Sequence, residues 1–230
     1  MLYQEIKNKE REFTAMTSYT LQEFQALLPF FQTSLDEVKI TLEGKERIKT
    51  TKSYKNSPFP STEDKLFFIL SYYKQYTTQT MLAATFRITQ PKANQWIHYL
   101  SPVLKQALSL AKVAPSRNPE SLLSEEVGLY AHDGTERPIQ RPLDEEKQKQ
   151  FYSGKKKGHT VKNNVVANDD CHVLYLTSTA EGKKHDKKLS DEENYSFPEG
   201  SSLLQDTGFQ GFTPEGVEIL QPKKSQKGEL

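Results

Sequence analysis

The hydrophobic pattern of the chain changes at about residue 111, and this change limits the folds that the chain can adopt. Before it, apolar residues recur at three- and four-residue spacings, which is the period of an amphipathic helix. After the polar, proline-containing stretch KVAPSRNPES, apolar runs alternate with turn signals, as strands do. The sequence therefore predicts an α+β chain in which an all-α part precedes a mixed α/β part.

Composition narrows the classes of protein that fit. The chain has 230 residues, of which 35% are hydrophobic, so it can bury a core. Its 31 Lys and Arg nearly balance 30 Asp and Glu, so any affinity for nucleic acid must come from local patches. The sequence has no apolar stretch of about 18 residues and no secretory leader at its start. With Cys171 as its single cysteine, we expect a cytoplasmic protein without a membrane partner.

Residues 1–60 are interpreted as an N-terminal helix and a basic linker. The helix is predicted from Thr20 to Val38, with a capping box formed by Thr20 and Glu23 and a possible kink at Pro29. The stretch that follows is either a solvated connector or an arm that lies on DNA phosphates. Its basic residues are Lys45, Arg47, Lys49, Lys52 and Lys55.

Residues 61–111 are predicted to form a helix-turn-helix domain. Ser61 caps a first helix, with Asp64 three residues later. A short helix over Gln79 to Phe86 and a turn at Arg87 to Thr89 come next, and a last helix runs from Gln90 to about Leu100.

The last of these helices has the side chains that a recognition helix requires. Its exposed face is predicted to carry Gln90, Lys92, Asn94 and Gln95. Gln and Asn can bond to adenine edges in the major groove, and Lys can reach guanine or phosphate. The alternative is an ordinary pair of packed helices that does not read DNA, in which Trp96 is a hydrophobic anchor.

Residues 112–124 are predicted to be a linker, and residues 125–230 a mixed sheet with one helical insert at HDKKLSDEENY. The five strand-like runs are EVGLYAHDG, HTVKNNVVANDD, CHVLYLTSTA, SLLQDTG and VEILQP. Two of these runs end in an aspartate, Asp133 and Asp206. Carboxylates at strand ends suit a hard cation such as Mg²⁺, although Asp-Gly at a strand end is also a common turn.

The stretch DGTERPIQRPLDEEKQKQFYSGKKKGHTVKNNVV, with the later HDKK and LLQDTGFQGF motifs, resembles the RNase H-like catalytic domain of bacterial insertion-sequence transposases with DDE chemistry. The preceding STEDKLFFILSYYKQYTTQTMLAATFRITQPKANQWI resembles the helix-turn-helix upstream of that domain. The resemblance covers about Ser61 to Leu230. It implies metal-dependent phosphoryl transfer on double-stranded DNA at the ends of a mobile element, with Mg²⁺, or Mn²⁺ as a substitute, held by Asp133 and Asp206.

The resemblance is incomplete at one position. The family places a third acidic residue, a glutamate, on a helix after the fifth strand, and the given sequence stops just beyond that strand. Neither Glu218 nor Glu229 matches the motif, so we expect an incomplete RNase H-like domain, incomplete metal coordination and an uncovered apolar sheet face.

Further residues of this part suit DNA binding or an accessory role. Lys155, Lys156 and Lys157 either track a DNA backbone or form a solvated basic hairpin. Arg137 and Arg141 either clamp phosphates or pair with nearby acidic residues. His185 and Asp186 match the family's HD motif, and we expect Asp186 to cap a helix rather than to act as a third carboxylate. Cys171 is expected to be a small buried or edge residue at a strand start.

These observations support two functions of different classes. The first is a transposase chain that binds element ends and supplies part of a metal-dependent strand-cleaving site, either with a downstream transposase polypeptide or as a homo-oligomer. The second is a catalytically inactive DNA-binding protein that occupies element ends, and a remnant without function is a third reading.

Overall fold

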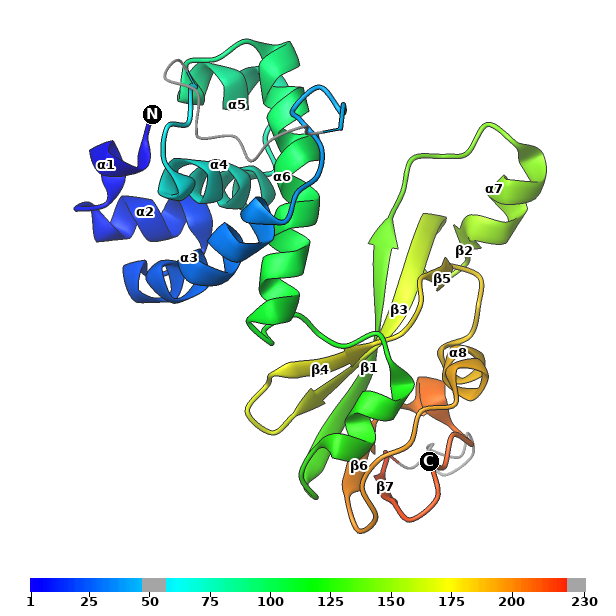
Figure 1. Cartoon of the computed structure of the whole chain (residues 1–230). Coiled ribbons are helices and arrows are strands. Elements are labelled where there is room, and N and C mark those ends of the chain that lie inside the picture. The colour runs from blue at the N-terminus through cyan, green and yellow to red at the C-terminus, as the bar shows by residue number, and fades with distance from the viewer. Residues whose placement is uncertain (47–56, 223–230) are drawn as a thin grey trace. The chain divides into compact units, whose positions relative to one another are not determined.

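The computed structural model describes residues 1–46 and 57–222. Contacts divide the chain into two compact units, residues 1–114 and 115–230, and each is described by itself (Figure 1). The predicted α+β class is confirmed, since the first unit is helical and the second holds a mixed sheet. None of the helices in the described ranges is long and apolar enough to cross a membrane.

The helical unit packs six helices of the described residues around one core. They are α1 (Tyr3–Ile6), α2 (Glu10–Thr17), α3 (Leu21–Asp36), α4 (Thr62–Gln75), α5 (Gln79–Phe86) and α6 (Gln90–Leu110). The predicted capping boxes are present: the Thr20 side chain accepts from the Glu23 amide, and the Ser61 side chain accepts from the Asp64 amide. These bonds satisfy amides that have no partner inside a helix, so α3 and α4 begin where the sequence indicated.

The helix-turn-helix lies where it was predicted, at α5 and α6. Arg87 adopts a left-handed conformation with φ of 55°, which ends α5, and Thr89 is the N-cap of α6. Trp96 is 7% exposed and packs against Phe59, as expected of an anchor. The last helix is longer than predicted because it continues through Pro102 to Leu110, and Pro29 likewise lies inside an unbroken α3.

The first three helices share the core of the helix-turn-helix. Phe13 of α2 stacks on Phe67 of α4, and Phe67 in turn contacts Phe86 of α5. The backbone N–H of Tyr3 donates to the buried Asp64 carboxylate over 2.9 Å. Of the predicted basic linker, Arg47, Lys49, Lys52 and Lys55 lie outside the described residues, and Lys45 is exposed.

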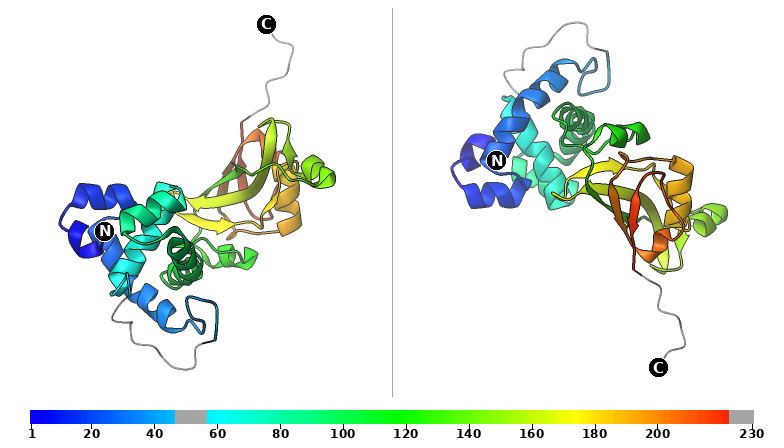
Figure 2. Two further views of the ribbon diagram at one scale, coloured as in Figure 1. Left: turned by 90° about the horizontal axis from the view of Figure 1, so that it is seen from above. Right: turned by 90° about the horizontal axis from the view of Figure 1, so that it is seen from below.

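The second unit is a mixed sheet with order β2-β3-β1-β6-β7 in its described part, and β4 and β5 pair with β3. All five predicted strand regions are confirmed, and the predicted third one divides into β4 and β5. Figure 2 shows α8, the predicted helical insert, lying along one side of the sheet. The elements are η1 (Pro119–Ser124), β1 (Leu129–Pro138), α7 (Glu145–Phe151), β2 (Tyr152–Ser153), β3 (Gly158–Asn168), β4 (Val173–Leu176), β5 (Ala180–Glu181), α8 (Asp186–Glu193), β6 (Ser202–Gln205), η2 (Thr207–Phe209) and β7 (Glu218–Leu220).

The two faces of this sheet differ in burial. On one face, Tyr130, Val166 and Leu203 form a core with aromatic residues from the segment after α8. On the other, Leu129, Leu204 and Leu220 are 42%, 49% and 38% exposed. Within the described residues, this face is therefore the more exposed of the two.

Candidate functional sites

Asp133 and Asp206 come together through strand pairing. Strands β1 and β6 are parallel, and their register ends with His132 opposite Gln205. The next pair in that register is Asp133 and Asp206, on strands that lie about 4.8 Å apart. Both aspartates are exposed, whereas His132 and Gln205 are buried, so the two carboxylates project from the same, outer face. Both aspartates therefore directly follow the end of one parallel ladder, and they are here called the acidic pair.

Asp133 does not end its strand, which corrects the prediction. Its strand continues to Pro138 because the antiparallel ladder with β3 extends that far, to the pair of Pro138 and Thr160. Only the parallel ladder with β6 stops before Asp133. Asp206 follows the last residue of β6, as predicted.

Each aspartate uses one oxygen locally. Oδ1 of Asp133 accepts from the Gly134 amide over 2.7 Å, and Oδ1 of Asp206 accepts from the Gly208 amide over 2.8 Å. Within the part of the chain that the structure describes, Oδ2 of neither residue accepts a hydrogen bond from the protein. Carboxylate oxygens that accept no hydrogen bond are suitable ligands for one hard divalent cation. No group of three or more metal-ligating side chains occurs among the described residues.

Asp186 lies near Asp206 but does not cap α8, so that interpretation is wrong. His185 is the N-cap, and the Asp186 carboxylate instead pairs with Nζ of Lys162 over 3.0 Å. A β-carbon on Gly208 would lie 2.9 Å from Oδ1 of Asp206 and 3.5 Å from Oδ2 of Asp186. Two carboxylates therefore converge at Gly208, and Lys162 balances the charge of one of them.

Behind the aspartates, a buried chain of hydrogen bonds joins α8 to three strands. The Asn164 amide of β3 donates to Oγ of Ser190 over 2.8 Å, and the hydroxyls of Ser190 and Tyr195 lie 2.7 Å apart. The Tyr195 hydroxyl contacts Nε2 of His132, whose Nδ1 faces Oε1 of Gln205 at 3.4 Å. The residues that precede the two aspartates are thus linked to each other and to α8.

His132 is neutral within this chain. Gln205 uses its amide nitrogen to donate to the Phe212 carbonyl, so its oxygen faces His132 and favours a proton on Nδ1. Nε2 then faces the Tyr195 hydroxyl. Burial lowers the pKa of His132 to about 4, against a smaller upward effect of the Gln205 hydrogen bond. A protonated His132 ring would have two N–H donors and no nitrogen that can accept a hydrogen bond from its neighbours.

Comparisons with known proteins identify two regions of the chain. The model of the family "Helix-turn-helix of DDE superfamily endonuclease" matches residues 61–110, and that of "DDE superfamily endonuclease" matches residues 132–229. The chain belongs to the DDE superfamily of insertion-sequence transposases. Members of this superfamily generally use divalent metal ions, in line with an acidic pair inside the matched region.

A related protein is the probable transposase for insertion sequence element IS702 from Microchaete diplosiphon. It is 23% identical over 180 residues, which cover 73% of this chain. The chain spans 64% of the length of that relative. No solved structure matches the chain.

In the matched helix-turn-helix, the predicted recognition residues do not share one exposed face. Gln90 and Lys92 are exposed, but Asn94 and Gln95 are half-buried because α6 turns them toward neighbouring elements. Nε2 of Gln90 and Nδ2 of Asn94 both donate to Oε1 of Gln79, over 2.7 and 3.2 Å. The sequence analysis missed Gln79, although its place at the start of α5 was predicted.

Lys92 and Gln95 have different surroundings. Nζ of Lys92 lies 3.8 Å from a carboxylate oxygen of Glu43, and both side chains are about half exposed. Oε1 of Gln95 is buried and lacks a hydrogen-bond partner within the described residues. Lys92 therefore remains available to DNA, and Gln95 is more remote than predicted.

The basic residues of the DDE region lie in the β2–β3 turn, on β1 and in the segment before α7. Lys155, Lys156 and Lys157 are exposed in the turn between β2 and β3, as a basic hairpin requires. Neither alternative for the arginines is confirmed, because both bond to amides: Arg137 donates to Asn163, and Arg141 donates to Gln148.

The structure also shows where Glu218 and Cys171 lie. Glu218 starts β7 opposite Ser202, at the far end of the ladder from Asp206, so it does not join the aspartates. Cys171 is exposed in the turn before β4, not buried or at the strand start, because the turn needs a residue with φ of 61°. Glu229 lies outside the described residues.

Proposed function

We propose that the chain acts in DNA transposition: it binds the ends of its mobile element and contributes to metal-dependent strand cleavage and transfer. The observation that carries the proposal is the parallel pairing of β1 with β6 up to His132 and Gln205, the residues that precede Asp133 and Asp206, within the region that matches the DDE family. Residues 61–111 would be the DNA-binding domain and residues 125–230 the catalytic one. The single exposed cysteine fits a reducing cytoplasm.

Asp133 and Asp206 would hold Mg²⁺, with Mn²⁺ as a substitute, through their outward oxygens. The chemistry that a bound divalent cation supplies is polarisation of a phosphoryl oxygen and activation of a water or a 3′-hydroxyl. The aspartates contribute two negative charges, which balance one divalent cation. Asp186 is already paired with Lys162, so it offers little net charge to a second cation.

Gln90, Lys92, Asn94 and Gln95 would contact element-end DNA. Gln90 and Asn94 each direct an amide N–H to Gln79, which leaves their carbonyl oxygens and second N–H groups for a base edge. Asn94→Ala should cost about 1 to 3 kcal/mol for the correct site, and loss of Lys92 should act mainly on salt dependence. Unchanged sequence preference after replacement of all four would contradict this assignment.

The experiment that tests the catalytic part measures cation binding and strand cleavage by the purified chain on duplex DNA from the element ends. We expect Mn²⁺ to bind and Asp133→Asn to weaken that binding at least tenfold, with DNA affinity retained. We expect no detectable cleavage by this chain alone, because the described residues hold no third free carboxylate near the pair. Cleavage that Asp133→Ala abolishes would show instead that a third carboxylate takes part, and Asp186 would be tested first.

The second candidate function is a catalytically inactive protein that occupies element ends. It is favoured by the same lack of a three-carboxylate group among the described residues and by a helical unit with a core of its own. In a competition assay, this chain is added to complete transposase. Inhibition of the transposase that persists when this chain carries Asp133→Ala supports this second function.

The proposal includes a protein partner, either a downstream transposase polypeptide or a second copy of this chain. Its support is the exposed face that carries Leu129, Leu204 and Leu220. Sedimentation of the purified chain, alone and with the partner polypeptide, distinguishes the two.

A further inference from the structure

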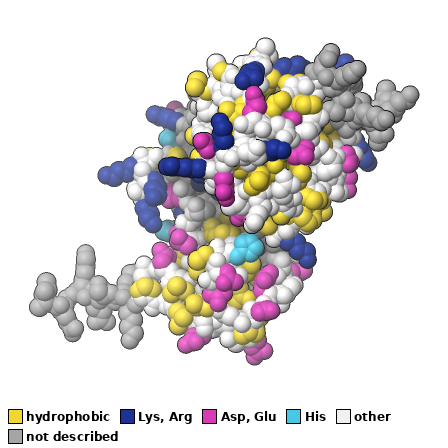
Figure 3. Space-filling model, turned by 90° about the vertical axis from the view of Figure 1, so that its left-hand side faces the viewer, with side chains coloured by type: hydrophobic (Ala, Val, Ile, Leu, Met, Phe, Trp, Pro, Cys, Tyr) yellow, Lys and Arg dark blue, Asp and Glu magenta, His cyan; other side chains and the backbone are white. Residues whose placement is uncertain are grey.

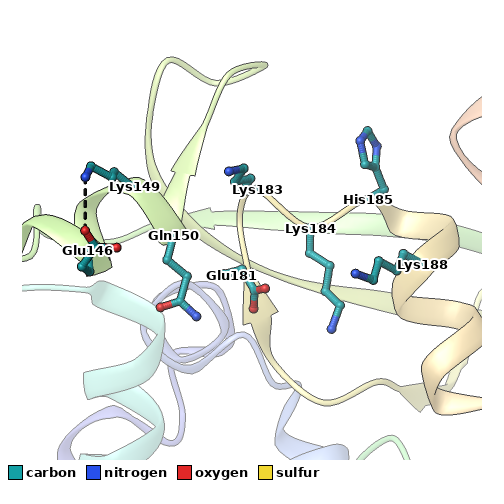
Figure 4. A pocket seen from close by; sticks show the side chains of 8 residues that line it. All are labelled: Glu146, Lys149, Gln150, Glu181, Lys183, Lys184, His185 and Lys188. Atoms are coloured by element: carbon teal, nitrogen blue, oxygen red, sulfur yellow. Dashed lines mark hydrogen bonds and ion pairs between the residues drawn. The ribbon is translucent and has the colours of Figure 1, made fainter.

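Residues 182–188, here called the lysine ridge, separate two hollows in the second unit. One hollow, of about 420 Å³, is lined by the ridge, by the basic hairpin and by Gly134, the residue after Asp133. The other, of about 510 Å³, lies between the ridge and α7 (Figure 4). Lys183, Lys184 and His185 line both hollows, so the ridge presents cationic side chains to each side.

The ridge is held firmly at both ends. At one end, the Gly182 amide donates to the Thr160 carbonyl over 2.9 Å, and a β-carbon on Gly182 would lie only 1.9 Å from Oγ1 of Thr160. At the other end, Asp186 pairs with Lys162, whose side chain is 10% exposed. Only glycine fits at position 182, so the close approach to β3 sets the path of the ridge.

Two of the lysines beside the hollows have no acidic partner. Lys184 pairs with Glu192, and Lys149 of α7 pairs with Glu146, as drawn in Figure 4. Within the described residues, Lys183 and Lys188 form no ion pair, although they line a hollow with four lysines and two glutamates. A concentration of unpaired cations on a fixed backbone is suited to an anion.

This cationic surface is local. On the face shown in Figure 3, Lys and Arg side chains are interspersed with Asp and Glu. The ridge also reaches strand β1, since Asp186 lies 3.0 Å from where a β-carbon on Gly134, the residue after Asp133, would be. An anion on the ridge would therefore lie close to the strand that carries Asp133.

We propose that the lysine ridge seats the phosphate backbone of the DNA strand that reaches Asp133 and Asp206, with Lys183 and Lys188 as the phosphate contacts. This inference rests on the proposed function, because the DNA is that substrate. Phosphodiester groups supply the negative charge that the ridge lacks, and cations placed along a groove can follow a strand.

Lysine acetylation measured by mass spectrometry on the whole chain tests the contacts directly. With a duplex from the element ends bound, the reactivity of Lys183 and Lys188 should fall at least threefold. Lys187 is the internal control, because it lies on the same helix but pairs with Asp191. Inorganic phosphate at the concentration of the DNA phosphates should protect neither ridge lysine; equal protection would mean a small-anion site and overturn the proposal.

Variants of the whole chain test the same contacts by salt dependence. The double variant Lys183→Gln/Lys188→Gln should reduce the slope of log affinity against log salt by about 1.8, at about 0.9 for each lost phosphate contact. Lys187→Gln should leave the slope unchanged. Gly182→Ala should reduce the slope without changing the charge, and circular dichroism would show whether that variant folds.

The outcomes separate this proposal from the broader one. If the chain binds DNA through Gln90 and Asn94 but the ridge lysines stay reactive and the slope is unchanged, the ridge proposal is wrong and the proposed function stands. If the chain does not bind element-end DNA at all, both are wrong.

Discussion

The two units place their candidate functional residues in different ways. In the helical unit, Gln79, Gln90 and Asn94 are near neighbours in sequence, and a single turn between α5 and α6 brings them together. In the sheet unit, Asp133 and Asp206 follow the same end of the parallel ladder only because β1 and β6 pair in one register. A local site depends on helix geometry, whereas a distant pair depends on the whole sheet.

The hydrophobic cores of the two units also differ. The helical unit encloses a dense aromatic cluster in which Phe13, Phe67 and Phe86 are at most 4% exposed. The sheet unit has a smaller apolar core and relies on the hydrogen-bonded chain around His132, while its outer face leaves Leu204 half exposed. We therefore expect the helical unit to depend mainly on packing and the sheet unit on polar contacts.

The largest expected effect breaks the helical core. Phe67→Ala should lower the free energy of unfolding by about 3 to 5 kcal/mol, because it leaves a cavity between Phe13 and Phe86. Chemical denaturation followed by circular dichroism measures the loss. Tyr76→Ala, at a position 97% exposed, is the control and should change it by less than about 0.5 kcal/mol. An equal loss in the sheet unit, seen by hydrogen exchange, would contradict independent cores.

The next effect is a pH dependence confined to the sheet unit. The folded pKa of His132 is about 4, below its ordinary value of 6.5, so the unfolded chain binds a proton first. Stability should therefore be complete above about pH 6.5 and fall by about 3 kcal/mol as the pH drops toward 4, at about 1.4 kcal/mol per pKa unit.

This dependence is measured by unfolding in metal-free buffer across that pH range. His132→Gln removes the titrating group and serves as the comparison. If the variant and the original chain lose stability in parallel between pH 6.5 and 4, then His132 does not account for the loss.

A smaller effect is expected on DNA recognition by the helical unit. Gln79→Ala should reduce discrimination between the correct and an altered DNA site by about 1 kcal/mol, because the amides of Gln90 and Asn94 lose their common acceptor. Gln79→Glu keeps an accepting oxygen and should retain the preference while weakening binding overall. Competition binding with both duplexes measures the two quantities, and Thr80→Ala is the neighbouring control.

The smallest effect concerns the outer face of the sheet. Leu204→Thr should change the stability of the chain by less than about 0.5 kcal/mol, since this side chain is 49% exposed. Leu203→Ala, one position away on the buried face, should cost about 2 to 5 kcal/mol. Thermal unfolding compares the two variants. Similar losses would show that the outer face is covered in solution.

Much of the helical unit was predictable because its signals are local. The capping residues Thr20 and Ser61 and the turn at Arg87 each act within a few residues, so the starts of α3 and α4 and the helix-turn-helix agreed with the sequence. Exposure on α6 was less predictable. Whether Asn94 and Gln95 face solvent depends on what packs beside them, and periodicity alone does not report the neighbours.

In the sheet unit, the strand regions, the helical insert and the two aspartates that follow apolar runs were predictable from the sequence alone. Three features were found only in the folded sheet: Asp133 lies inside a longer β1, Asp186 pairs with Lys162, and His132 contacts Tyr195. The two groups of features differ in the sequence separation of the residues that produce them. Strand periodicity depends on residues that are neighbours in the sequence. Register, buried hydrogen bonds and ion pairs join residues that are distant in the chain, so they exist only once the sheet has formed.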